Sequence, residues 1–521
     1  MCRIFKKFMC LLLIFVISFL VPSCKKEVTN LPAPDGEKIV YGQNVNLFSY
    51  YPDTFNPFLT GIRENYDILM LLYEPLFAVN ENGAASACLA AAASFENNNL
   101  TVRIRLRDDV VFQSGEKFSA DDVIFTLKYI AEYAPEFLYV LDNVKSYSKD
   151  GADVIFNLKT PQFNFVSCLD FPIICKNTDI NAFNGGSYQK NGCGAFLVDT
   201  QSVRQKEMRL VKNENYYNSD LPYFSSVTVS FLKEPSVAVS AFNGSEISAL
   251  TSDEFVWGDV SFTNDHTIFE YGGEWFYFLA VNYENALIGD VNVRKIINSA
   301  LDKQDMVQKV FQTHAYAANS ILNPAYNYGA AYSNEFDLDN AALYAKEADI
   351  ADKNRDGVYE KVIDDTSFSL SFDVLVNGDD AKLSEIADFV SEGAKKAKIR
   401  FNLKRLSGDD YLAALDKKDY DILVSKERIR AGDNLSAKID FNGKYSVPYE
   451  IYESLAKTLG EATDKNTNEK MREFDSGYMS LLPCIALCYS SSALICQYSL
   501  KNMSAWQNGR YRGILEGFIK Y

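Results

Sequence analysis

LTVRIRLRDDVVFQSGEKFSADDVIFTLKYI, residues 100–130, combines the local signals of a strand, a turn and a helix. In its first part arginines alternate with apolar residues, which predicts a strand with one buried face formed by Val102, Ile104 and Leu106. Ser119 stands where a helix N-cap is expected, and Asp121 and Asp122 favour the first turn. The buried stripe of this helix is expected at Val123, Ile124, Leu127 and Ile130.

Similar strand and helix signals recur along the rest of the chain. Alternation predicts further strands within residues 38–51, 154–158 and 227–231, and a helix is expected after the turn at Asn56 and Pro57. Asp290 is expected to cap another helix, and the apolar periodicity continues after Asp302. The pattern is typical of a mixed α/β protein.

Size and composition limit the architecture and the partners. The chain has 521 residues, more than the roughly 250–300 at which a single core stops growing, so at least two lobes are expected. Hydrophobic residues make up 47%, enough for real cores. The net charge of −17 argues against a nucleic-acid-binding surface, which needs a basic patch.

The N-terminus has the pattern of an export signal. Arg3, Lys6 and Lys7 precede an apolar run at residues 8–21, which is short for a bilayer span of about 20 residues but typical of a signal peptide. We expect residues 1–23 to be removed, which predicts an extracytoplasmic protein, on the cell surface or in the periplasm.

The end of this segment, Leu-Val-Pro-Ser-Cys, resembles the lipobox of bacterial lipoproteins, in which the cysteine receives the lipid. Cys24 would then become the lipidated N-terminus that anchors the protein to the membrane, followed by a tether through residue 37. The alternative is a simple secretory signal with an incidental cysteine, because Pro22 is unusual in that box.

The remaining cysteines predict buried thiols. Cys484, Cys488 and Cys496 lie in an apolar stretch with no nearby histidine to complete a zinc site. A bridge between Cys168 and Cys175 is compatible with an oxidising compartment, and the sequence leaves it open.

Catalytic and metal motifs are sparse. The two histidines, His266 and His314, are isolated from each other, and no local motif supports a carboxylate-pair hydrolase. A DKNRDG stretch copies the start of a calcium loop, with Asp352, Asn354, Asp356 and Gly357. Position twelve of that loop, where an EF-hand needs a glutamate, is Ile363, so we expect a turn before a strand and no metal site.

Several stretches, in one order, together resemble a known family. They are DTFNPFLT (53–60), LMLLYEPLFAVNENG (69–83), the opening stretch at 100–130, NGCGAFLVD (191–199), FLAVNYENALIGDVNVRKIINSALDKQDMVQKVF (278–311) and KKDYDILV (417–424). The resemblance is to the extracellular solute-binding proteins of the peptide/nickel class, solute-binding protein family 5, which includes oligopeptide- and dipeptide-binding lipoproteins of ABC importers.

The resemblance implies a two-lobe periplasmic-binding-protein-like α/β fold with a hinge-closing cleft. The first lobe would comprise residues 38–75, 190–278 and 497–521, with an extra subdomain at 76–189. The second lobe would comprise residues 279–496.

The implied function is capture of a peptide or peptide-like solute in the cleft and its delivery to a membrane permease. The resemblance implies no catalysis and no cofactor, and we expect a monomer. Two alternatives stay open: a ligand-sensing receptor on the same fold, or a binder of a non-peptide solute such as an oligosaccharide or a chelated metal.

Position within the family pattern suggests two ligand-binding segments. Peptide binders of this family add the ligand backbone to short extended segments of the protein. Here the corresponding segments contain Gly61 and Ile62, and Trp275 and Tyr277. The alternative is that these aromatic residues belong to the core at the hinge.

The stretch SKERIRAGDN departs from the family pattern. Arg430 stands roughly where oligopeptide binders have an aspartate that holds the ligand's amino group. Either Glu427 or Asp433 takes that role, or Arg428 or Arg430 binds a carboxylate of the ligand. A third interpretation is a solvated charge run on a loop.

Overall fold

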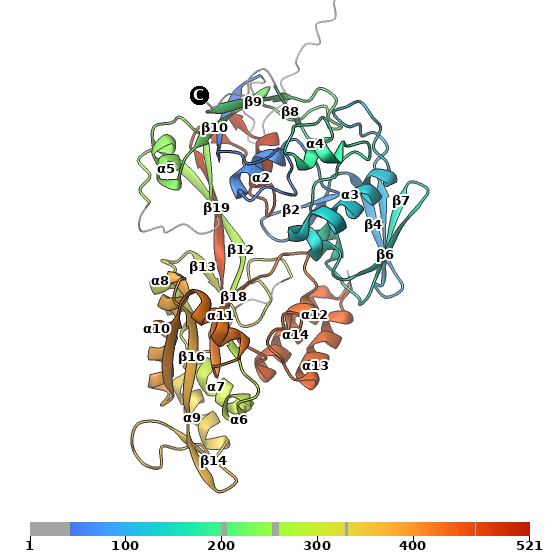
Figure 1. Cartoon of the computed structure of the whole chain (residues 1–521). Coiled ribbons are helices and arrows are strands. Elements are labelled where there is room, and N and C mark those ends of the chain that lie inside the picture. The colour runs from blue at the N-terminus through green and yellow to red at the C-terminus, as the bar shows by residue number, and fades with distance from the viewer. Residues whose placement is uncertain (1–41, 200–205, 253–259, 329–331, 464, 521) are drawn as a thin grey trace, which may run out of the picture.

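The computed structural model describes residues 42–199, 206–252, 260–328, 332–463 and 465–520. The chain forms two α/β lobes, one above the other in Figure 1. The long strands β12 (His266–Val281) and β19 (Ile485–Gln497) run from one lobe into the other and pair with each other in antiparallel fashion. The predicted signal peptide at residues 1–23 and the predicted tether at residues 24–37 lie outside the described residues.

The first lobe is built on a four-stranded sheet in the order β1-β10-β9-β8, in which β1 and β10 are parallel. Its strands are β1 (Asn44–Tyr50), β8 (Phe196–Val198), β9 (Glu207–Lys212) and β10 (Ser226–Leu232). Smaller elements of this lobe are α2 (Arg63–Leu69), β2 (Phe77–Val79), β3 (Ala85–Ala87), α4 (Ile180–Asn184), α5 (Pro235–Asn243), β11 (Ala249–Ser252), β20 (Leu500–Lys501) and β21 (Phe518–Ile519).

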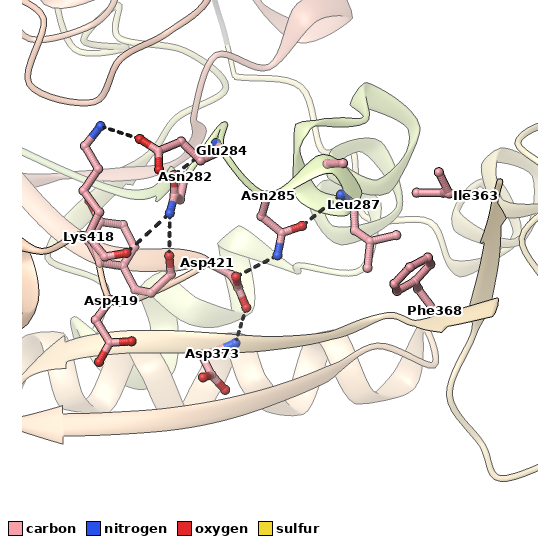
Figure 2. Close-up of a pocket in the computed structure, with 12 residues that line it drawn as sticks. Asn282, Glu284, Asn285, Leu287, Ile363, Phe368, Asp373, Lys418, Asp419 and Asp421 are labelled. Carbon is pink, nitrogen blue, oxygen red and sulfur yellow. Dashed lines mark hydrogen bonds and ion pairs between the residues drawn. The ribbon is translucent and has the colours of Figure 1, made fainter. Parts of the chain in front are cut away.

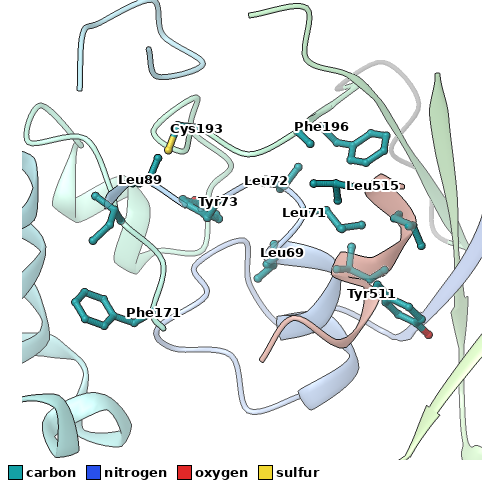
Figure 3. Close-up of a cluster of buried hydrophobic side chains, with 14 of the residues drawn as sticks. Leu69, Leu71, Leu72, Tyr73, Leu89, Phe171, Cys193, Phe196, Tyr511 and Leu515 are labelled. Carbon is teal, nitrogen blue, oxygen red and sulfur yellow. The ribbon is translucent and has the colours of Figure 1, made fainter. Parts of the chain in front are cut away.

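The C-terminal segment returns to the core of the first lobe. Figure 3 shows Tyr511 and Leu515, from the 3-10 helix η4 (Arg510–Leu515), beside Leu69 and Leu71 at the end of α2. Next to them the buried Arg510 Nε donates to Asp67 Oδ2 at 2.6 Å. Both ends of the described chain therefore stabilise the same lobe.

The opening stretch of the sequence forms most of a subdomain on the first lobe. Its sheet has the order β4-β5-β7-β6, and α3 (Ala120–Tyr133) packs against it. Ser119 caps α3 through a capping box with Asp122, as the sequence predicts. The strands are β4 (Ala90–Glu96), β5 (Thr101–Leu106), β6 (Val144–Asp150) and β7 (Asp153–Leu158), with 3-10 helices η1 (Pro135–Val140) and η2 (Phe165–Leu169).

The second lobe continues the β12–β19 ribbon into a larger sheet, in the order β11-β19-β12-β18-β16-β17 with β13 beside β19. Its strands are β13 (Ala315–Ala317), β16 (Ser371–Asn377), β17 (Arg400–Leu406) and β18 (Ile422–Arg428), and the hairpin β14 (Glu360–Ile363) and β15 (Thr366–Ser369) lies apart at the bottom of Figure 1. The helices are α6 (Ala286–Gly289), α7 (Val291–Ser299), α8 (Lys303–Val310), α9 (Leu338–Glu347), α10 (Ala381–Lys396), α11 (Gly408–Asp416), α12 (Leu435–Lys438), α13 (Tyr449–Gly460) and α14 (Thr467–Leu481). Asp290 caps α7, as the sequence predicts, and Asp302 caps α8.

All seven cysteines of the body are free and buried: Cys88, Cys168, Cys175, Cys193, Cys484, Cys488 and Cys496. The bridge that the sequence left open is not formed, since the Cys175 thiol donates to Glu116 Oε2 at 2.7 Å and the Cys168 thiol contacts the carbonyl of Gly432. These thiols pack as small apolar groups.

Candidate functional site

The two lobes touch through the loop that follows β18. Asn164 in the subdomain donates from its side-chain amide to the carbonyls of Ala431, at 2.6 Å, and of Asp433, at 3.0 Å. Gln162 donates in the same way to the carbonyl of Gly432 at 2.8 Å. These side chains recognise main-chain groups of the opposite lobe, so the contact depends on the shape of the loop.

Gly432 lies directly against the backbone of the opposite lobe, at Ser167 and Cys168. A Cβ atom on this residue would lie 2.3 Å from the backbone nitrogen of Cys168. Farther along the interface, Asn99 donates to the carbonyl of Ala462 at 2.7 Å. The structure therefore represents a closed arrangement of the lobes.

A small polar cavity of about 10 Å³ remains between the closed lobes. That volume accommodates about one water molecule, so the lobes must separate before a larger solute can enter. The cavity is lined by Val79, Tyr139, Ser167, Asp170, Gln507 and Asn508 on one side and by Glu274, Arg430, Ala431 and Gly432 on the other.

Asp170 is the most perturbed acid in this cavity. Its side chain is buried, Oδ2 accepts from the backbone N–H of Val79 at 3.1 Å, and Oδ1 has no hydrogen-bond partner among the described residues. Burial raises its pKa from 3.8 to about 8, and the nearby Glu274 adds to the rise, whereas Arg512 and Arg63 oppose it. In the closed form this carboxyl is therefore largely protonated at neutral pH.

Two arginines line or flank the cavity with different partners. Arg430 lies over the ring of Tyr139, 4.0 Å from its centroid, and its Nη1 is 3.9 Å from Asp433 Oδ1. Arg428 donates from Nε to Glu274 Oε2 at 2.6 Å, and this carboxylate raises the pKa of Arg428. The site thus holds both signs of charge at the junction of the lobes.

The predicted residues on β18 do not all face this cavity. Successive side chains of a strand point to opposite faces, and Glu427 lies on the face away from Arg428. Glu427 accepts from the hydroxyl of Tyr445 at 3.0 Å and pairs with Lys444, both in the second lobe. Of the charged residues predicted from SKERIRAGDN, Arg430 lines the cavity.

The two aromatic residues predicted on β12 pack against the core of the second lobe. The ring of Tyr277 is 1% exposed and packs edge-on against Phe311, with centroids 5.2 Å apart. Trp275 is partly buried and carries Lys426 over its ring at 5.1 Å. From Phe276 to Leu279 the strand pairs with β18 on one side and β19 on the other.

Gly61 and Ile62 lie just before α2, close to the cavity but not in its lining. The backbone N–H of Gly61 donates to Asp53 Oδ2 at 2.8 Å. The next residue, Arg63, donates to the carbonyl of Gln507 at 2.8 Å and to Asn508 Oδ1 at 3.3 Å. This segment therefore supports two residues that line the cavity.

Sequence reasoning missed Asp170, Glu274, Tyr139 and Gln507. The sequence does contain a signal for Glu274, which precedes the aromatic run WFYF. A charged residue in such an apolar segment is rarely buried unless it has a partner. No local signal marks Asp170, whose burial results from tertiary contacts.

A larger open pocket of about 530 Å³ is lined by residues of the second lobe (Figure 2). Its polar groups bond mainly to one another: Asp421 accepts from the side chain of Asn285 at 2.7 Å and from the backbone N–H of Asp373 at 2.8 Å. Lys418 donates to Glu284 at 3.2 Å. Because these groups are already paired and the pocket is remote from the lobe junction, the cavity between the lobes is the better candidate for the functional site.

Within the described ranges, no helix has the length and apolar character needed to cross a membrane.

The family model "Bacterial extracellular solute-binding proteins, family 5 Middle" matches residues 86–441. Among curated proteins, the chain is 25% identical over 364 residues to the oligopeptide-binding protein AppA of Bacillus subtilis, covering 67% of this chain and 66% of AppA. It is 22% identical over 326 residues to the nickel-binding periplasmic protein of Escherichia coli, covering 60% of each. The matches thus span 60–66% of these relatives' own length.

Solved structures show the same fold over nearly the whole chain. The unliganded open form of the murein-tripeptide-binding protein MppA has a TM-score of 0.75 at 15% identity, covering 93% of this chain and 98% of that one. AppA of Bacillus subtilis in complex with a nonapeptide has a TM-score of 0.60 at 20% identity, covering 93% and 100%. NikA of Brucella suis with Fe(III)-EDTA has a TM-score of 0.67 at 18% identity, covering 92% and 100%. These likenesses confirm the predicted two-lobe fold.

Proposed function

Because the chain belongs to the bacterial extracellular solute-binding proteins, family 5, we propose that it binds a peptide or peptide-like solute between its lobes and delivers it to the permease of an ABC importer. The observation that carries this proposal is the closed junction in which Asp170, Glu274 and Arg430 line one small cavity. The names of relatives, which include oligopeptide-binding and dipeptide-binding proteins, support the solute class.

The charges of the cavity suit a solute that carries both an ammonium and a carboxylate group. Glu274 can accept from an ammonium group, and Arg430 can donate to a carboxylate. In the closed form Glu274 is paired with Arg428, and Arg430 lies over the ring of Tyr139. The pKa of Asp170 is raised to about 8. An incoming solute would replace those internal contacts when the lobes reopen and close around it.

The hinge of this movement is proposed at the middle of the β12–β19 ribbon. The register of the two strands shifts between Gly272 and Phe276, where the regular ladder is interrupted. A short irregular stretch can absorb the change in backbone angles that domain closure requires. The proposed first lobe is residues 38–75, 190–278 and 497–521, with its subdomain at 76–189, and the proposed second lobe is residues 279–496.

The proposal places the protein outside the cytoplasm, anchored through a lipid on Cys24 and acting as a monomer beside its permease. The support is the leader pattern of the sequence and the family name, which describes extracellular proteins. Catalysis is not part of the proposed role.

Native mass spectrometry on the chain from Lys25 onward, purified gently from its host, tests the proposal directly. We expect a set of co-purifying peptides that leaves on denaturation and is lost in Glu274→Gln. The matched control is Glu385→Gln, on the exposed surface of α10, which should retain the ligand. Co-purification of a single chelate or sugar, in place of peptides, would show that the solute is not a peptide. Equal retention of the ligand by both variants would rule out this cavity as the binding site.

A further inference from the structure

A cluster of three carboxylates lies in the second lobe, in the loop between α9 and β14. Carboxylate oxygens of Asp352, Asp356 and Glu360 lie within 4.8 Å of one another. The base of the loop is closed by two main-chain hydrogen bonds between Ala351 and Glu360, at 2.9 and 3.1 Å. The three acids are therefore held together by the backbone, in spite of their mutual repulsion.

Glu360 supplies an independent sign of a missing ligand. The residue is 4% exposed, and although Oε2 accepts from the backbone N–H of Lys353 at 2.7 Å, Oε1 has no hydrogen-bond partner among the described residues. A buried carboxylate oxygen without a partner costs free energy unless a cation or donor satisfies it. The oxygen that lacks a partner belongs to the same cluster as the other two acids.

The neighbouring cation does not satisfy the cluster. Lys398 Nζ lies 3.0 Å from Asp352 Oδ2, whereas Glu360 Oε1 has no hydrogen-bond partner among the described residues. One ammonium group against three carboxylates leaves an excess of negative charge at the loop. The side chain of Lys398 is also about half exposed, so water weakens its interaction with the buried Glu360.

We propose that this loop binds a calcium ion through Asp352, Asp356 and Glu360, with Asn354 available as a further oxygen donor. Calcium–oxygen distances of 2.3–2.6 Å put two ligands on opposite sides of one ion about 4.6–5.2 Å apart, which accommodates the observed spacing. The smaller magnesium ion would require a tighter set. The sequence predicted a turn without a metal site, because Ile363 stands at position twelve of the loop, where an EF-hand has a glutamate. In the structure the acid that joins the cluster is Glu360, at position nine.

This site is distinct from the cavity between the lobes, and its expected role is structural. Glu360 is also the first residue of β14, so a bound ion would fix the base of the β14–β15 hairpin. Isolated extracellular calcium modules bind with Kd values of roughly 10⁻⁴–10⁻³ M, and we expect an affinity in that range.

Calorimetry tests the proposal on the chain from Lys25 onward after treatment with a chelator. We expect one calcium ion to bind, Glu360→Gln to weaken binding by about tenfold or more, and magnesium to bind more weakly. The matched control is Asp365→Asn, an exposed acid in the turn of the same hairpin and outside the cluster. No heat of binding at about 10 mM calcium, or equal affinity in the two variants, would overturn the site.

A second measurement guards against a variant that fails to fold. Terbium should replace calcium in the unsubstituted protein and luminesce when tyrosine is excited, because Tyr359 adjoins Glu360. Tyr359→Phe should reduce that luminescence while leaving the calcium affinity unchanged. Terbium luminescence that excess calcium does not displace would contradict the proposal.

Discussion

The guanidinium of Arg430 lies over the ring of Tyr139, 4.0 Å from its centroid, and joins the second lobe to the subdomain of the first. Such a contact contributes about 0.5–2 kcal/mol, depending on how far the cation is desolvated. The arginine at the position that departs from the family pattern therefore takes part in closing the lobes as well as lining the cavity.

Replacing Arg430 by alanine should weaken a carboxylate-bearing solute by more than tenfold, about 1.4 kcal/mol, because a charge-assisted bond and the ring contact are both lost. Calorimetry with the co-purified solute measures the change. Arg405→Ala is the matched control, since Arg405 is a partly exposed arginine paired with Asp388 on the outer surface. An unchanged affinity in Arg430→Ala would remove this residue from the site.

Asp170 should make the folding stability depend on pH. Its pKa is raised from the ordinary value of 3.8 to about 8 in the folded protein, so folding takes up a proton between those values. The stability that the protonated group contributes is complete below pH 3.8, falls as pH rises and is lost above about pH 8. In Asp170→Asn this dependence should disappear. The difference in the free energy of unfolding between the two proteins should therefore change by up to about 1.4 kcal/mol per pH unit.

Thermal melting from pH 4 to 9 measures this effect as the difference between the unsubstituted protein and Asp170→Asn. Asp388→Asn, which changes an exposed carboxylate, should leave the pH profile as it is. A melting difference that stays constant across the range would show that Asp170 does not titrate as described.

Valine at position 432 should hold the lobes apart. Any Cβ there would meet the backbone of Cys168 in the closed form, at 2.3 Å from its nitrogen, whereas separated lobes leave room for it. We expect a larger radius of gyration by small-angle scattering and solute affinity reduced by about tenfold or more. Gly460→Ala, at a glycine with open space around it, is the control and should change neither quantity. A closed Gly432→Val protein would contradict the described interface.

Cys24→Ser should release the protein from the membrane while leaving solute binding intact, because the proposed lipid attaches to the cysteine thiol. Partition between detergent and aqueous phases, with labelled fatty acid, measures the anchor. Cys88→Ser, at a buried thiol of the body, should retain the lipid. Labelling of Cys24→Ser equal to that of the unsubstituted chain would refute the assignment.

Local signals predicted the elements of the fold well. The capping box at Ser119, the alternation in β5 and the aspartate cap of α7 depend on residues close together in the sequence, and the structure contains all of them. Periodicity could not show that the C-terminal helix η4 packs against α2, because that contact joins residues more than 400 positions apart.

The candidate site was harder to predict for the same reason. Arg430 stood out because it replaced an expected acid, but its partner Tyr139 lies in another lobe and nearly 300 residues earlier. Glu427 and Arg428 were grouped because they are adjacent in sequence, although adjacent residues of a strand point to opposite faces. The burial of Asp170 exists only when Val79, Arg512 and the second lobe surround it.

The seven thiols buried in the body have a practical consequence for how this protein is made. With no covalent cross-link to form or shuffle among them, the chain needs no oxidant or disulfide isomerase to reach its folded state. Burial also raises the pKa of Cys496 to about 12, and the other six are shifted upward in the same way, so the reactive thiolate form is scarce. The folded body should therefore tolerate reducing agents and mild oxidants alike, whichever side of the membrane it folds on.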